Sequence, residues 1–110
     1  MKTINDYCHD AYSNAALKGW HEKERSVGDL IALMHSELSE ALEEYRNGHA
    51  PNEIYFPDGA KPEGIPVELA DCIIRIFDFC GKYAIDLQQA IDMKMEYNKT
   101  RPHRHGGKQV

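Results

Sequence analysis

The stretch VELADCII, residues 67–74, places two acidic side chains inside an otherwise apolar run. Glu68 and Asp71 are three residues apart, so in a helix they lie on the same face. A helix that buries Leu69 and Cys72 gains nothing from carboxylates beside them, because a buried charge without a partner is costly. The two acidic side chains therefore indicate a purpose other than packing.

The same pattern occurs in an earlier stretch, HSELSEALEE at residues 35–44, where Glu37 and Glu40 are again three apart among apolar residues. If the two helices pack antiparallel, the four carboxylates meet in one cleft. Such a cluster repels itself and takes up protons unless a cation compensates it. Mg²⁺, which prefers oxygen ligands, is the expected cation. For the first pair alone, the ordinary alternative is a solvated helix face.

Four helices and no strand are predicted, which makes the fold all-α. Apolar residues at helical spacing, N-cap residues and stop signals set their limits. The N-caps are Thr3 (paired with Asp6), Ser26 and Asp86 (paired with Gln89). A loop rich in proline and glycine fills residues 48–66, and its length indicates a functional or mobile segment. The expected helices cover about residues 4–18, 27–46, 66–82 and 86–100.

The third helix is apolar on nearly all sides, so several neighbours must cover it. A chain of 110 residues forms one domain, residues 1–110, that supplies about two such neighbours. We therefore expect the central helices to pack against a symmetry-related subunit, in a homodimer or homotetramer.

Composition excludes some classes of function. The formal net charge of −5 argues against binding to a nucleic-acid polymer. Three cysteines, an odd number without a C-x-x-C pair, favour reduced thiols and a cytoplasmic protein. No segment is typical of a signal peptide or a membrane span. Iron or manganese in a ferritin-like bundle requires Glu-x-x-His motifs, which this sequence lacks.

Three segments resemble the MazG-like, all-α nucleoside triphosphate pyrophosphohydrolases. They are SELSEALEEYRNG, VELADCIIRIFDFCGKYAIDL and KMEYNKTRP, and the resemblance covers roughly residues 17–108. The family motif is E-E-x-x-E followed by E-E-x-x-D. This chain departs from it only at the two leading acidic positions, which are Ser36 and Val67.

The resemblance implies a four-to-five-helix bundle that hydrolyses a nucleoside triphosphate, often a deoxy or non-standard one, to the monophosphate and pyrophosphate. It implies Mg²⁺, with Mn²⁺ as a possible substitute. No covalent intermediate is expected, because no Ser, Cys or His in the sequence lies in a nucleophile setting. The implied catalytic and metal-binding residues are Glu37, Glu40, Glu68 and Asp71. The implied substrate contacts are Lys94, Asn98, Arg101 and Trp20.

Several of these positions have alternatives. Trp20 is either a core anchor or a stacking platform for the base, and Asp78 is either a base contact or an intersubunit partner. Glu44 is expected to face solvent rather than to act as a fifth carboxylate. The basic tail, about residues 102–110, is either a solvated terminus or a segment that folds over the triphosphate.

No function is assigned to His9, His21, His35 or His49, because their spacing fits no metal site. The competing function is non-enzymatic: a helical dimer that uses its acidic face as a partner-binding module. It explains the apolar third helix but not the carboxylates embedded in it.

Overall fold

The computed structural model describes residues 1–102, and this part of the chain is all-α. It contains four helices, α1 (Ile4–Leu17), α2 (Val27–Arg46), α3 (Ile65–Lys82) and α4 (Leu87–Lys99). Among the described residues there is no strand, only an isolated antiparallel bridge between Tyr55 and Glu63. The predicted fold class is confirmed.

The predicted N-caps are also confirmed. Thr3 Oγ1 accepts a hydrogen bond from the Asp6 amide at 3.1 Å, while the Thr3 amide donates to Asp6 Oδ2 at 2.8 Å. Ser26 Oγ and Asp86 Oδ1 each accept from the amide three residues later, at 3.0 Å. Helix α3 begins at Ile65, one residue earlier than predicted, with Pro66 still in the first turn.

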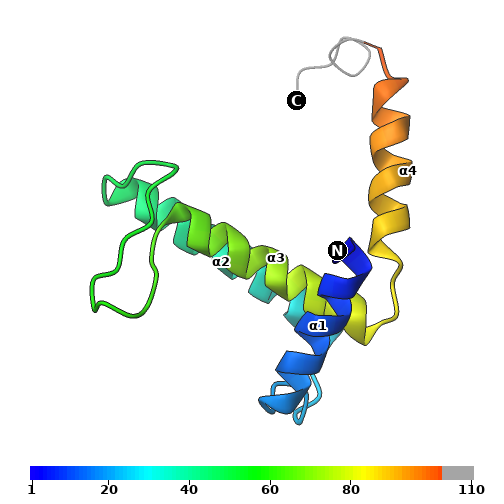
Figure 1. Ribbon diagram of the computed structural model, residues 1–110, viewed down its shortest axis with the longest axis horizontal. Coiled ribbons are helices and arrows are strands. Elements are labelled where there is room, and N and C mark those ends of the chain that lie inside the picture. The colour runs from blue at the N-terminus through cyan, green and yellow to red at the C-terminus, as the bar shows by residue number, and fades with distance from the viewer. Residues whose placement is uncertain (103–110) are drawn as a thin grey trace.

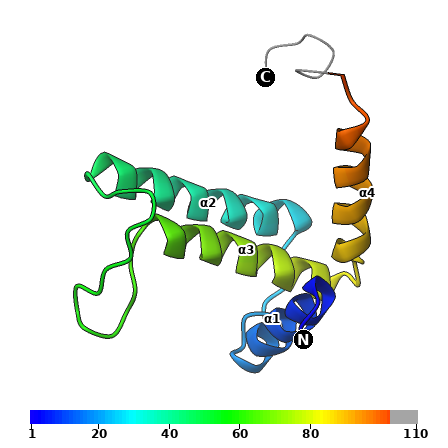
Figure 2. The same cartoon turned by 45° about the horizontal axis from the view of Figure 1, so that its top comes forward.

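Helices α2 and α3 lie side by side and antiparallel, joined at one end by the loop that connects them (Figure 2). Helix α1 packs across α3 near its C-terminal end, where the Tyr7 and Phe77 rings stack with centroids 5.7 Å apart. Cys8 and Cys80 are buried at this crossing, and burial raises the pKa of both thiols. All three cysteines are free thiols, as expected.

Helix α4 projects away from the other three (Figure 1). Its contact with them is to α1, where the side chain of Asn5 donates to Asp86 Oδ1 at 2.8 Å and accepts from the Gln88 amide at 3.1 Å. Met93, Met95 and Tyr97 on this helix are all more than half exposed. Within one chain, the four helices therefore do not close into a compact bundle.

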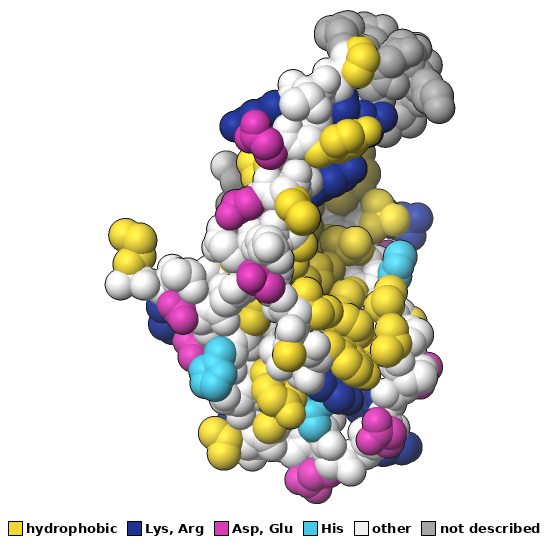
Figure 3. Space-filling view, turned by 90° about the vertical axis from the view of Figure 1, so that its right-hand side faces the viewer, with side chains coloured by type: hydrophobic (Ala, Val, Ile, Leu, Met, Phe, Trp, Pro, Cys, Tyr) yellow, Lys and Arg dark blue, Asp and Glu magenta, His cyan; other side chains and the backbone are white. Residues whose placement is uncertain are grey.

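The buried core is small. Its apolar members are Cys8, Ala41, Cys72 and Cys80, and no large side chain of the described residues is fully buried. Figure 3 shows hydrophobic side chains gathered on the surface where α4 leaves the rest of the chain. A soluble monomer rarely leaves so much apolar surface uncovered.

No helix in residues 1–102 combines the length and the hydropathy needed to cross a membrane. The basic tail lies outside the described part of the chain from residue 103 onward, and this includes His103, Arg104, His105 and Lys108.

The crossing of α1 and α3 yields a stability prediction. A Cβ added at Gly81 would lie 2.5 Å from the backbone oxygen of Cys8 and 2.5 Å from the Cβ of Tyr12, both on α1. Because both atoms belong to rigid parts of α1, we expect Gly81→Ala to lower the free energy of unfolding by about 1–3 kcal/mol. Urea unfolding at one fixed protein concentration measures the change.

Gly28→Ala is the matched control, since an added Cβ there meets only Ser26 Oγ, at 3.8 Å, and alanine favours the helix. This variant should be as stable as the wild type or more so. Equal urea midpoints for Gly81→Ala and the wild type would contradict the close crossing.

Candidate functional site

The four predicted carboxylates line one cavity of about 290 Å³ between α2 and α3. Glu37 and Glu40 come from α2, and Glu68 and Asp71 come from the first turns of α3. Oxygen atoms of Glu37, Glu40 and Glu68 lie within 4.8 Å of one another. The antiparallel pairing of the two helices thus brings together the two acidic pairs seen in the sequence.

This crowding changes the acidity of Glu68. Burial, the neighbouring charges of Glu40, Asp71 and Glu37, and a hydrogen bond with Asp71 together raise the pKa of Glu68 to about 7. Burial is the largest cause, followed by the charge of Glu40. The cavity therefore holds a carboxyl group that is close to half protonated at neutral pH in the absence of a cation.

Glu37 is the buried member of the cluster and is paired with Arg75. Its side chain is only 10% exposed, and its Oε1 accepts a hydrogen bond from Arg75 Nε at 2.9 Å. Arg75 was not among the predicted site residues, although a signal was present: it is the only basic residue between Pro66 and Cys80, in a run as apolar as the one around Glu68.

A second cavity, of about 570 Å³, adjoins the first and shares Glu37, Lys61 and Asp71 with it. Its wall includes Trp20, which is 51% exposed. Within one chain, the interpretation of Trp20 as a core anchor is therefore wrong, because the indole is not buried in the core. The indole remains available for stacking.

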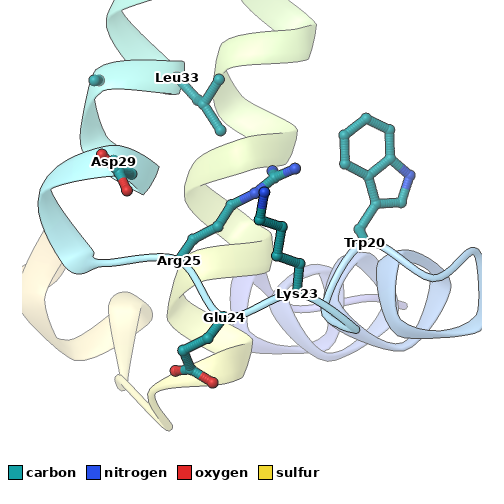
Figure 4. Close-up of a pocket in the computed structure, with 7 residues that line it drawn as sticks. Trp20, Lys23, Glu24, Arg25, Asp29 and Leu33 are labelled. Carbon is teal, nitrogen blue, oxygen red and sulfur yellow. The ribbon is translucent and has the colours of Figure 1, made fainter.

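Trp20 also borders a third cavity, of about 510 Å³, in the turn between α1 and α2. Figure 4 shows the side chains of Lys23 and Arg25 extending the same way beside the indole, while Glu24 points away. The guanidinium groups of Arg25 and Arg75 each lie 5.9 Å from the centroid of the indole ring. Such contacts favour a fixed orientation of the ring.

Asp78 lies in the wall of the second cavity and is held by a histidine. Asp78 Oδ1 is 2.8 Å from His21 Nε2, and both side chains are largely buried. The His21 ring in turn packs against the Tyr12 ring, with the two ring centroids 5.1 Å apart. His21, to which no function was assigned from its spacing, thus holds Asp78 in position.

The loop between α2 and α3 is fixed to the acidic end of both helices. Tyr55 donates a hydrogen bond to Glu44 at 2.8 Å and forms backbone hydrogen bonds with Glu63 at 2.8 and 3.0 Å. The bond to Glu44 raises the pKa of Tyr55 to about 12, so the phenol stays a neutral donor. His49 stacks on the Tyr55 ring at 4.3 Å.

These contacts correct one expectation. The Glu44 side chain is 12% exposed rather than solvent-facing, because Tyr55 and His49 cover it. Its carboxylate also lies within 4.8 Å of those of Glu63 and Glu68, beside the main cluster.

The residues expected on the last helix do not join the cluster within one chain. Lys94 and Asn98 lie on α4, and Arg101 follows it; none of them lines the two adjoining cavities. Helix α4 starts after the C-terminal end of α3. At a rise of 1.5 Å per residue, that end of α3 lies roughly 16 Å from Asp71. Lys94 and Arg101 instead lie against the Tyr97 ring, at 4.9 and 5.7 Å.

Comparisons of the chain with family models, with curated proteins and with solved structures found no match.

The raised pKa of Glu68 predicts how stability depends on pH. Because the folded protein keeps this proton up to about pH 7 and the unfolded chain loses it near 4.5, folding binds a proton between these values. Stability is then lost as the pH rises through this window, by about 3 kcal/mol at most from this group. Thermal unfolding with a chelator, at pH 5 and pH 8, measures the effect.

Glu68→Gln should match the wild type near pH 5 and exceed it in stability at pH 8. Glu43→Gln, which removes an exposed carboxylate paired with Arg46 at 3.5 Å, is the control and should follow the wild type at both values. Parallel pH profiles for the wild type and Glu68→Gln would mean that Glu68 titrates normally.

Proposed function

We propose that this protein is a Mg²⁺-dependent nucleoside triphosphate pyrophosphohydrolase, which converts a triphosphate to the monophosphate and pyrophosphate. The observation that carries the proposal is the junction of two cavities, one lined by four carboxylates and the other bordered by the exposed Trp20. A nucleoside triphosphate has two matching parts, a flat base and a polyanionic chain that accompanies metal ions. A cellular use in removing non-standard or excess deoxynucleotides fits this activity.

The donor set fits Mg²⁺. Glu37, Glu40 and Glu68 supply only carboxylate oxygens. Burial is the largest cause of the raised pKa of Glu68, and the charges of Glu40 and Asp71, which a cation would offset, raise it further. Hard oxygen ligands suit Mg²⁺ and also Mn²⁺, whereas zinc sites usually include histidine or cysteine. When bound, the ion supplies positive charge to phosphate oxygens and lowers the pKa of water.

The side chains around the cluster have separate functions in this proposal. Trp20 stacks on the base, an interaction available to any base. Arg75 holds one oxygen of Glu37 and so fixes the orientation of that carboxylate. Glu68 gives up its proton when a cation enters, because a neutral carboxyl is a poor ligand.

We further propose that the active unit is a homodimer or homotetramer. Leu38 and Leu42 on α2, and Leu69 and Ile73 on α3, are each 43% to 48% exposed and lie four residues apart on their helices. Pairing such stripes with a second copy would cover them. Association would also let the projecting α4 bring Lys94, Asn98 and Arg101 to the acidic cavity of another subunit.

The activity itself is the first test. With Mg²⁺, the protein should release pyrophosphate in one step from at least one member of a panel of ribo- and deoxynucleoside triphosphates. In ¹⁸O-labelled water the label should enter the nucleoside monophosphate, because the proposal places attack at the α-phosphorus. Asp71→Asn and Glu68→Gln should each lower kcat/KM by roughly 100-fold or more, since each weakens charge stabilisation worth several kcal/mol.

Glu43→Gln is the control on α2, because Glu43 is 60% exposed and does not line the cavity; it should keep full activity. Orthophosphate as the first product would contradict the reaction. A panel without any turnover would favour the partner-binding module instead.

Assembly gives a separate prediction. In sedimentation at micromolar concentration the wild type should exceed the 12.6 kDa of one chain. Ile73→Glu should shift it towards the monomer, because a charge placed in an apolar interface must be desolvated. Ile54→Glu is the control: Ile54 is as exposed as Ile73 but lies in the loop, so this variant should sediment like the wild type. A wild-type monomer would contradict the assembly.

A further inference from the structure

Lys61 occupies the boundary between the two cavities of the candidate site. The acidic cavity of about 290 Å³ and the adjoining cavity of about 570 Å³ (the Trp20 cavity) share three lining residues, Glu37, Asp71 and Lys61. Two of these are acidic, so among the described residues Lys61 is the one cation that borders both spaces. A ligand that extends from the indole to the carboxylate cluster must pass its side chain.

The segment that carries Lys61 is held in place by the loop contacts on either side. Tyr55 fixes the loop to Glu44 on α2 and, through the backbone bridge, to Glu63. At the next turn Gly64 has φ of 128° and lies so close to the backbone oxygen of Glu53 that a Cβ would not fit. The backbone near Lys61 is therefore tied to the acidic end of both helices.

The ammonium group itself is available. The Lys61 side chain is 77% exposed, and its ion pair with Glu63 spans 3.4 Å on the surface, where such pairs contribute little. The other cation in the wall of the Trp20 cavity, Arg75, is already bonded to Glu37 at 2.9 Å. Lys61 can change partners at low cost, while a change by Arg75 would leave a buried carboxylate without a partner.

We propose that Lys61 binds the phosphate chain of the substrate where it passes from the Trp20 cavity to the carboxylate cluster. The inference rests on the proposed function and names a residue that the family motif does not contain. A lysine suits this position, because an ammonium is a compact charge that bonds phosphate oxygens without a fixed geometry. Its charge also reduces the repulsion between the polyanion and the carboxylates.

The test uses inorganic tripolyphosphate with Mg²⁺, which contains the phosphate chain but no base. Calorimetric titration of the full chain should show that Lys61→Gln raises the Kd for tripolyphosphate about tenfold or more, the usual effect of losing a charged hydrogen bond. Lys61→Arg should stay close to the wild type. Lys2→Gln, which removes the same charge from another exposed and ion-paired lysine, should leave the Kd unchanged.

Two further readouts separate a phosphate contact from a structural one. Lys61→Gln should keep the Tm of the wild type and bind Mg²⁺ alone at least as tightly. Equal Kd values for tripolyphosphate in the wild type and Lys61→Gln, or no binding by the wild type, would overturn the inference. If the proposed function alone is wrong, the result is different. The wild type then binds tripolyphosphate through Lys61 but hydrolyses no member of the nucleotide panel.

Discussion

The antiparallel packing of α2 on α3 forces like charges together, and the rest of the site depends on this constraint. Carboxylates three residues apart face the same way on each helix, so the pairing that buries Ala41 and Cys72 also brings Glu37 and Glu68 close to each other. The free chain offsets this repulsion in two local ways. Arg75 pairs with the most buried carboxylate, and Glu68 keeps a proton.

Each of these compensations leaves part of the cluster able to accept a cation. Arg75 engages one oxygen of Glu37, and a carboxylate has a second oxygen. The proton on Glu68 can leave near neutral pH, because the pKa of this carboxyl group is about 7. Both compensations are compatible with the proposed cation site.

The sequence predicted the parts of this structure that depend on neighbours in the chain. The N-caps at Thr3, Ser26 and Asp86 follow from residues within four positions of each other and were confirmed, and the predicted helix limits agree with the structure to within about one residue. The convergence of the acidic pairs required one long-range assumption, antiparallel packing. Arg75 and Lys61 could not be placed from the sequence, because their positions depend on which helix face or loop segment meets the cavity.

The exposure of Trp20 and the direction of α4 are long-range properties of the same kind. A lone tryptophan after a helix is compatible with a core or with an open cavity, and the choice depends on how the turn before α2 folds back. The apolar character of α3 indicated uncovered surface. It did not indicate that α4, the helix available to cover it, would lie elsewhere.

The first turn of α4 is bonded to a single side chain near the start of α1. Asn5 receives one hydrogen bond from the Gln88 amide and gives one to Asp86, at the first turn of the last helix. These bonds join the start of α1 to the start of α4. A tag fused before Met1, or removal of the first few residues, would act on the position of Lys94 and Asn98 while leaving the carboxylate cavity untouched.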